Sequence, residues 1–149
     1  GEGWGLYTEW LGTLMGVYET PYDDFGRLTF EMWRAARLVI DTGLHEYGWS
    51  RQQAIDYLAA NTALAHHDIV TEVDRYIAWP GQATAYYLGY KTIRDLRSEA
   101  ERELGPTFDQ RPFHDTILNL GSVPLPVLES EVRAFIAERK AGQATVAAP

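Results

Sequence analysis

Apolar residues recur along most of this chain at the spacing of an α-helix. The first such stripe consists of Leu6, Trp10, Leu14 and Val17. Intervals of three or four residues place these side chains on one face of a helix, which we expect to face the core. Pro21 follows, and the residue before a proline disfavours the α conformation, so the first helix is expected to end near Glu19 and Thr20.

A second amphipathic helix is expected next, capped by Asp23 or Asp24. Its apolar stripe consists of Leu28, Met32, Ala35, Leu38 and Val39. A stripe at this spacing is typical of a helix face that packs on the core. The helix is expected to stop at about Thr42, because Gly43 is a natural residue for a helix C-terminus.

Turn signals divide the remainder of the chain into further helices. Ser50 and Gln53 have the spacing of a capping box, in which a hydroxyl and a side-chain amide each pair with a backbone N–H. The later helices are expected over residues 65–79 and 81–104, from a cap at Asp109 to about Leu120, and over 124–139. Alternation typical of strands is nearly absent. The pattern predicts an all-α fold, an irregular bundle of six or seven helices.

The domain organisation follows from length and composition. A chain of 149 residues is typical of one domain, which we place at residues 1–140. The weakly polar segment 141–149 is expected to be a disordered tail. The formal charge of −8 argues against nucleic acid or an anionic membrane surface as the main partner. The chain has no Cys, which excludes disulfides and thiolate metal sites. No apolar run is long enough to span a bilayer.

The histidines do not form a zinc motif by themselves. His45 and Glu46 match the first two letters of the H-E-x-x-H signature, but position 49 is Trp, so the second imidazole of that signature is missing. His66 and His67 are adjacent and point about 100° apart on a helix. A surface or capping role suits them better than chelation.

Three polar residues share one helix face if the second helix continues through Gly43. Arg37, Asp41 and His45 are spaced i, i+4 and i+8. In one interpretation Asp41 accepts a hydrogen bond from a ring nitrogen of His45, and Arg37 holds Asp41. In the other interpretation they form an ordinary buried polar network.

The segment from Arg75 to Tyr86 gathers a cation, two phenols, an indole and an amide around the Pro80 turn. The N–H groups at Gly81 and Gln82 begin a helix and can bind an anion. Tyr86 lies one turn beyond Gln82, where its phenol can donate to a developing oxyanion. The alternative is that the aromatic residues here are ordinary core residues.

Taken together, several short stretches resemble one known family. They are Glu2-Gly3-Trp4, Leu6-Tyr7 and Glu9; Arg34 to Val39, Asp41 to His45 and Gly48-Trp49-Ser50; Arg75-Tyr76, Pro80 to Ala83, Tyr86 and Gly89; Leu96-Arg97; Phe108-Asp109 and Phe113-His114-Asp115; and Gly121 with Pro124-Leu125. Over residues 2–135 the chain resembles the C-terminal part of a bacterial family catalogued as a domain of unknown function, DUF 885. That family is similar to the gluzincin zinc metallopeptidases.

The resemblance implies roles for particular residues. Glu2 would be the third zinc ligand, and two histidines and a catalytic glutamate would lie upstream, leaving one zinc position for water. From their residue types, His45 and Tyr86 are candidates to donate to the reacting oxygen. Arg75 or Arg97 would pair with a peptide carboxylate.

Three supporting residues complete the candidate site. We expect Gln82 to contact substrate. Arg37 and Asp41 are expected to orient His45 without contacting substrate themselves. Gly5 departs from the family, which more often has Ala at that position.

A chain with one zinc ligand is expected to be inactive alone, because catalytic zinc normally has three protein ligands. The expected cofactor is zinc, bound only in an intact protein. The expected partners are a short peptide substrate and the upstream half of the same protein, and exposed apolar surface would favour self-association. A bacterial protein is expected, exported or periplasmic, or else cytoplasmic. The alternatives are a non-catalytic helical interaction module and a metal-free domain that binds a small ligand.

Overall fold

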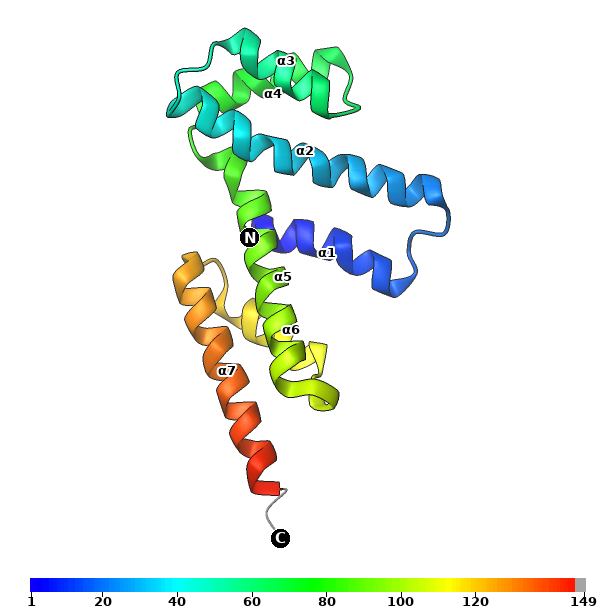
Figure 1. Ribbon diagram of the computed structural model, residues 1–149, viewed down its shortest axis with the longest axis vertical. Helices are drawn as coiled ribbons and strands as arrows, with labels where there is room; N and C mark the ends of the chain where they lie inside the picture. The colour runs from blue at the N-terminus through cyan, green and yellow to red at the C-terminus, as the bar shows by residue number, and fades with distance from the viewer. Residues whose placement is uncertain (147–149) are drawn as a thin grey trace. The chain divides into compact units, whose positions relative to one another are not determined.

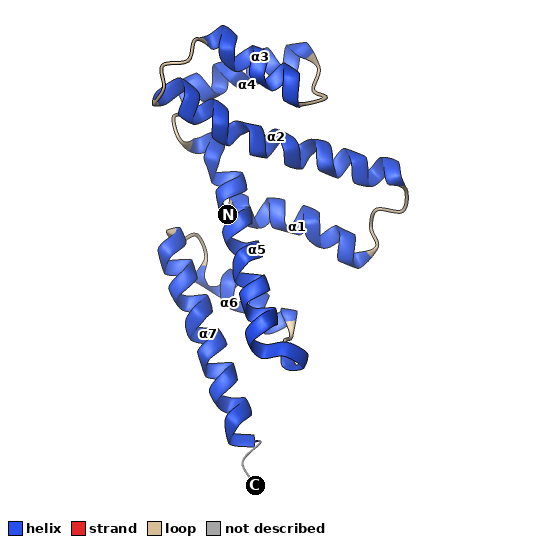
Figure 2. Ribbon diagram, in the orientation of Figure 1, coloured by secondary structure: helices blue, strands red, loops and turns tan. Residues whose placement is uncertain are grey.

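The computed structural model describes residues 1–146, with side chains through Gly142, and is helical nearly throughout (Figures 1 and 2). Its elements are α1 (Glu2–Met15), α2 (Pro21–His45), α3 (Arg51–Asn61), α4 (His66–Ala78), the 3₁₀ helix η1 (Gln82–Thr84), α5 (Ala85–Leu104), the 3₁₀ helix η2 (Gly105–Thr107), α6 (Gln110–Leu120) and α7 (Leu125–Val146). No strand occurs in these residues. The prediction of an all-α fold is confirmed.

The chain separates into two compact units. The first unit is residues 2–90, and the second is residue 1 with the residues from 91 onward. The expectation of one domain over residues 1–140 stays a prediction. Helix α7 continues to Val146, so it includes the first part of the segment 141–149 that was expected to be disordered. Residues 147–149 lie outside the described part of the chain.

Each unit has its own buried apolar residues. The cluster in the first unit joins α2, α3, α4 and η1 and consists of Ala36, Ile40, Ala54, Ile55, Leu58, Ile69, Val73, Tyr76 and Ala83. In the second unit the buried residues include Ile93, Leu96, Ala100, Leu104, Phe113, Ile117, Leu128, Val132 and Ile136. The helical spacing of apolar residues on α3, α4 and α7 predicts most of these buried residues, but Ala59 and Ile77, which share that spacing, are exposed.

The start of α2 differs from the prediction. Thr20 is the N-cap, and Asp23 is the third helical residue. The Thr20 hydroxyl accepts from the Asp23 N–H at 3.3 Å, and the Thr20 N–H donates to the Asp23 carboxylate at 2.9 Å. Pro21 fits the first turn because that position needs no N–H donor. The capping box at Ser50 and Gln53 and the cap at Asp109 were predicted correctly.

Helix α2 also continues past Gly43 and ends at His45. Gly43 serves packing rather than termination. A Cβ built on Gly43 would lie 2.5 Å from the ring of Trp49, so the absent side chain lets the indole rest directly on the helix. The condition for Arg37, Asp41 and His45 to share one helix is thereby met.

The apolar stripes expected to be buried on α1 and α2 are in part wrong. Leu14, Val17, Leu28, Met32 and Val39 are exposed. On α2 the core receives Trp33, Ala36 and Ile40 instead, a face about 100° around the helix from the predicted one. None of the helices in residues 1–146 combines the length and the hydropathy that a membrane crossing needs.

Candidate functional site

Most of the residues singled out from the sequence lie in the first unit. The helix α2 carries Arg37, Asp41 and His45, α4 carries Arg75, and the turn after α4 leads to Gln82 and Tyr86. The first residue of α1 is Glu2. Arg97 belongs to the second unit.

Arg37 is the centre of a buried polar network. The residue as a whole is 4% exposed. Its Nε donates to the Tyr76 hydroxyl at 2.9 Å and its Nη2 donates to Glu72 Oε2 at 3.0 Å. The indole N–H of Trp33 donates to the same hydroxyl at 2.9 Å. The guanidinium also lies 4.3 Å from the Trp33 ring centroid and 4.8 Å from that of Tyr86. These contacts satisfy a charge that would otherwise be costly to bury.

Asp41 binds the turn that follows α4, and not His45. Its two carboxylate oxygens accept from the Gly81 N–H at 3.1 and 3.0 Å. Gly81 has φ +81°, a conformation that glycine adopts without strain. The N–H that was expected to receive an external anion is thus occupied by a carboxylate of the same unit.

His45 is exposed, and its Nε2 lies 3.0 Å from the carbonyl oxygen of Tyr76. A carbonyl oxygen only accepts, so Nε2 carries the hydrogen in this contact. A neutral ring then presents an unprotonated Nδ1, which accepts and does not donate. The expected relay from Arg37 through Asp41 to His45 is replaced by three separate contacts. The physical reason is that each group has a partner on α4 or in the turn after it.

A chain of hydrogen bonds runs from α4 to the first turn of α5. Arg75 Nη2 donates to Glu72 Oε2 at 2.8 Å, and Arg75 Nη1 donates to Gln82 Oε1 at 2.9 Å. The amide nitrogen of Gln82 in turn donates to the Tyr86 hydroxyl at 3.4 Å. Tyr86 accepts in this contact, and its own hydroxyl proton remains available to donate.

The network shifts the pKa values of Glu72 and Tyr76, among others. Burial alone would raise the pKa of Glu72, but hydrogen bonds from Arg75 and the charge of Arg37 hold that pKa below its ordinary value of 4.5. Burial raises the pKa of Tyr76 to about 12, against an opposing effect of the Arg37 charge. Glu72 is therefore ionised and Tyr76 neutral at physiological pH.

Glu2 is brought to the start of α5 by a close helix crossing within the first unit. A Cβ built on Gly3 would lie 2.4 Å from backbone atoms of Gly89, and one built on Gly89 would lie 2.8 Å from the Gly3 Cα. The two backbones are therefore in direct contact. Tyr86 precedes Gly89 by three residues, about one helical turn. Glu2 and Tyr86 each lie within one turn of the crossing.

Metal-binding groups do not gather within residues 1–142. No three side chains of His, Cys, Asp or Glu in residues 1–142 lie together in a way that could hold an ion. Glu2 is exposed and offers one carboxylate. The described residues thus fit one ligand of a zinc site and do not form a complete site.

Sequence reasoning missed several members of this site. Glu72 joins Arg37 and Arg75, and the only local signal for it was its i, i+3 spacing with Arg75. Arg34 lies 3.4 Å from Glu9, with its guanidinium 5.2 Å from the Phe30 ring centroid. Its Nε is buried without a partner among the described residues. Contacts between residues 25 or more positions apart leave no periodic signal in the sequence.

Arg97 has partners of its own in the second unit. It is buried, its Nε donates to Glu101 Oε1 at 2.8 Å, and its Nη1 donates to Gln110 Oε1 at 3.4 Å. The guanidinium lies 5.5 Å from the Phe108 ring centroid. Burial and the charge of Arg97 lower the pKa of the nearby His114.

Comparisons with known proteins give a family and a structural neighbour. The model of a family described as "Bacterial protein of unknown function (DUF885)" matches residues 1–132. The fold is similar to a crystal structure described as "the putative lipoprotein from Colwellia psychrerythraea", with a TM-score of 0.89 and 46% sequence identity. That match covers 92% of this chain and 24% of the Colwellia chain. No curated protein matches.

Proposed function

Because this chain belongs to the DUF885 family of bacterial proteins of unknown function, we propose that it is the portion of a zinc-dependent peptidase that supplies one zinc ligand and substrate-facing donors for short peptides. The observation that carries the proposal is the crossing of Gly3 over Gly89. Glu2 is next to Gly3 in α1 and Tyr86 is three residues before Gly89 in α5, so a carboxylate and a phenol belong to the two helices that cross there. These two groups are separated by 84 positions in sequence (86 − 2).

Glu2 is the proposed zinc ligand. The carboxylate is exposed at the first residue of a helix, and within residues 1–142 it makes no ion pair that would compete with a metal. The other ligands would come from outside these residues, because a catalytic zinc normally has three protein ligands. When bound, zinc would polarise the scissile carbonyl and activate a water.

Tyr86 is the proposed donor to the substrate oxygen. Its hydroxyl accepts from Gln82, which fixes the oxygen and leaves the proton directed elsewhere. His45 suits this role less well, because its Nε2–H is engaged with the Tyr76 carbonyl. We therefore assign the donor role to Tyr86 and leave His45 as a residue that anchors α2 to α4.

Arg75 and Gln82 act as positioning residues in this proposal. Arg75 is held by Glu72, and it holds the Gln82 oxygen so that the amide nitrogen faces Tyr86. Their effect on substrate is through the orientation of the phenol. Arg97 remains a candidate for pairing with a peptide carboxylate, although its guanidinium already contacts Glu101.

The activity belongs to a longer polypeptide, since this chain spans about a quarter of the Colwellia protein. The test uses such a polypeptide containing this sequence. Glu2→Gln should leave the purified protein with less than stoichiometric zinc after dialysis, whereas Glu19→Gln, at another exposed carboxylate, should retain it. Unchanged zinc content and affinity in Glu2→Gln would remove Glu2 from the ligand set.

Tyr86→Phe tests the donor role separately. It should lower kcat for hydrolysis of a short peptide about 100-fold with little change in KM, the usual effect of removing one donor to a developing oxyanion. Zinc content should not change. A variant with full activity would exclude Tyr86 as the donor, and absence of chelator-sensitive hydrolysis in the parent protein would favour the helical interaction module.

The location of the protein is part of the same proposal. The structural neighbour is described as a "putative lipoprotein", and lipoproteins are exported. We propose that the longer protein is likewise exported, and fractionation of the native organism with antibodies against this chain would check it.

A further inference from the structure

The apolar face of α2 that the core does not use is the most prominent unexplained surface of the first unit. Phe25, Leu28 and Met32 are 64%, 47% and 52% exposed. They recur at the spacing of one helix face, and the sequence pattern predicts the burial of Leu28 and Met32. A helix with two apolar faces normally packs on both sides. Helix α2 meets α1, α3, α4 and η1, yet Phe25, Leu28 and Met32 remain exposed among the described residues.

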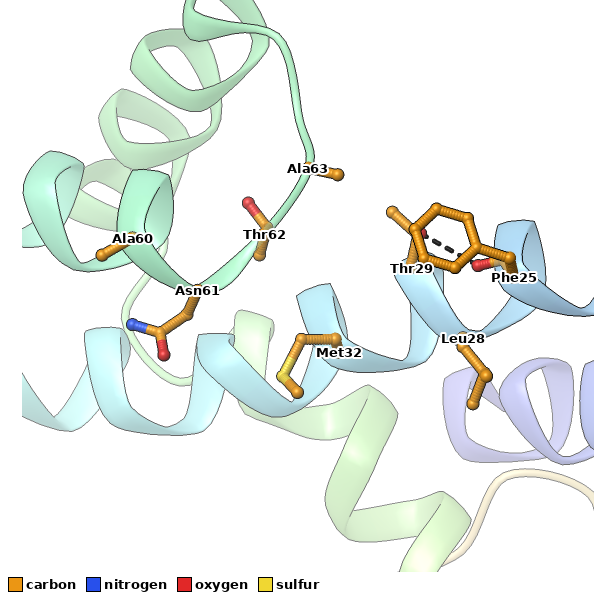
Figure 3. Close-up of a pocket in the computed structure, with 8 residues that line it drawn as sticks. All are labelled: Phe25, Leu28, Thr29, Met32, Ala60, Asn61, Thr62 and Ala63. Atoms are coloured by element: carbon orange, nitrogen blue, oxygen red, sulfur yellow. Dashed lines mark hydrogen bonds between the residues drawn. The ribbon is translucent and has the colours of Figure 1, made fainter. Parts of the chain in front are cut away.

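The uncovered face forms one side of a groove of about 350 Å³. The lining residues are Phe25, Leu28, Thr29, Met32, Ala60, Asn61, Thr62 and Ala63 (Figure 3). In Figure 3 the end of α3 and the segment after it, residues 60–63, form the wall opposite α2. None of the lining residues is charged.

The polar side chains of the groove each donate one hydrogen bond to a backbone carbonyl four residues earlier in the chain. The hydroxyl of Thr29 donates to the Phe25 carbonyl at 2.9 Å (Figure 3). Thr62 donates to the Leu58 carbonyl at 2.7 Å, and the Asn61 amide donates to the Tyr57 carbonyl at 2.8 Å. Methyl and methylene groups therefore dominate what the groove offers to an occupant. Such a surface favours an apolar partner over a polar ligand.

The structural neighbour is a longer chain, which offers a source for such an apolar partner. The Colwellia chain has the same fold over 92% of this chain, yet the match covers only 24% of its own length. Roughly three quarters of that polypeptide is thus additional to the shared fold. A related chain at 46% identity therefore provides, on the same molecule, a large supply of segments to cover an apolar helix face.

We propose that this groove is an interface within a longer polypeptide, and that it is occupied by the apolar face of a helix lying outside residues 1–149. Side chains of that helix pack between Phe25 and Met32 on one side and Ala60 and Ala63 on the other, as ridges of one helix enter grooves of another. The inference shares with the proposed function only the existence of the longer chain. It requires no zinc and no catalysis.

The absence of Cys in residues 1–149 allows a direct test by thiol accessibility. Met32→Cys places a thiol in the groove, and Gln52→Cys places one at an exposed polar position of α3. Each variant is made in the 149-residue chain and in the longer natural polypeptide. Maleimide labelling of each site is followed by peptide mass spectrometry, and circular dichroism checks that the variants fold.

We expect the rate of Cys labelling at position 32 to be at least tenfold lower in the longer polypeptide than in the short chain. The labelling rate at position 52 should be similar in both. Equal labelling at position 32 in both proteins would overturn the proposal. Protection at position 32 in the short chain would also overturn it. Protection that rises with concentration and with dimer mass in light scattering would assign the groove to a second copy. Protection of the monomer would assign it to this chain's own residues.

The two proposals fail separately. Loss of zinc in Glu2→Gln together with rapid labelling at position 32 would support the peptidase proposal and overturn the interface proposal. Slow labelling at position 32 together with zinc binding unaffected by Glu2→Gln would support the interface proposal and exclude Glu2 as a zinc ligand. A natural polypeptide that ends at these 149 residues would overturn the interface directly.

Discussion

At the scale of single residues, buried charged groups of the first unit pair with one another. Glu72 accepts from both Arg37 and Arg75, and Tyr76 accepts from Arg37 and Trp33. The Arg37 and Glu72 side chains are largely withdrawn from water, where an unpaired charge is expensive. These residues hold α2 against α4 and fix the orientation of the side chains that lead to Tyr86.

Glu72→Gln should lower the free energy of unfolding by about 3 kcal/mol at neutral pH, because it leaves two guanidinium groups without their shared carboxylate. Asp74→Asn, which breaks the exposed ion pair with Arg51, should have a much smaller effect. Urea unfolding of the three proteins measures the difference. Equal effects in the two variants would contradict a structural role for the buried network.

The lowered pKa of Glu72 predicts that the free energy of unfolding depends on pH. The pKa of Glu72 is lower in the folded chain than its ordinary value of 4.5, so the unfolded state binds the proton more readily. Its contribution to stability is complete above pH 4.5 and is lost as pH falls through the folded-state value. The slope of stability against pH in this acid range should be shallower in Glu72→Gln. An unchanged slope would show that other carboxylates account for acid unfolding.

Tyr76→Phe should destabilise the chain by about 1–3 kcal/mol, because the Trp33 and Arg37 N–H groups lose a buried acceptor. The pKa of Tyr76 is raised from 10.0 to about 12, so its stabilising contribution is complete below pH 10 and is lost as pH rises towards 12. Absorbance titration of tyrosinate should lose its latest-titrating group in the variant. A variant whose titration matches the parent would place the high pKa on another of the nine tyrosines.

At the scale of elements, glycines decide how closely helices approach. Gly3 and Gly89 allow backbone contact between α1 and α5, and Gly43 allows Trp49 to lie on α2. Gly5, two residues from Gly3 on the same helix, has no atom within 4 Å of a built Cβ. Two glycines in one helix are therefore predicted to respond oppositely to the same substitution.

Gly3→Ala should lower the free energy of unfolding by about 1–3 kcal/mol, because the added methyl meets backbone atoms that cannot rotate away. Gly5→Ala should raise it by up to about 1 kcal/mol through helix propensity. Chemical denaturation followed by circular dichroism compares the two. Stabilisation by both substitutions would mean that α1 does not cross α5 at these glycines.

At the scale of the whole molecule, the two units differ in their aromatic residues. All five tryptophans, at positions 4, 10, 33, 49 and 79, lie in the first unit. Tryptophan fluorescence therefore reports on the first unit alone, whereas circular dichroism at far-ultraviolet wavelengths reports on the helices of both. The difference allows the number of folding domains to be measured without any substitution.

We expect the two signals to diverge during urea unfolding, with part of the helix signal lost before tryptophan fluorescence changes. The reason is that each unit has its own buried apolar residues, and the described part of the second unit has fewer of them. Coincident transitions by both probes are the mark of a two-state domain. They would support the expectation, made from sequence, of one domain over residues 1–140.

The sequence by itself determined the helices and most of their ends, because helical period, capping residues and glycine or proline breaks act over a few neighbouring positions. Ser50 with Gln53 and Asp109 are examples. The family was also recognisable from short stretches of sequence. Tertiary structure decided which face of α2 is buried, where Asp41 and His45 find partners, and that α1 crosses α5 at Gly3 and Gly89. Those outcomes depend on contacts between residues tens of positions apart, and the alternative partners are chemically equivalent until the helices pack.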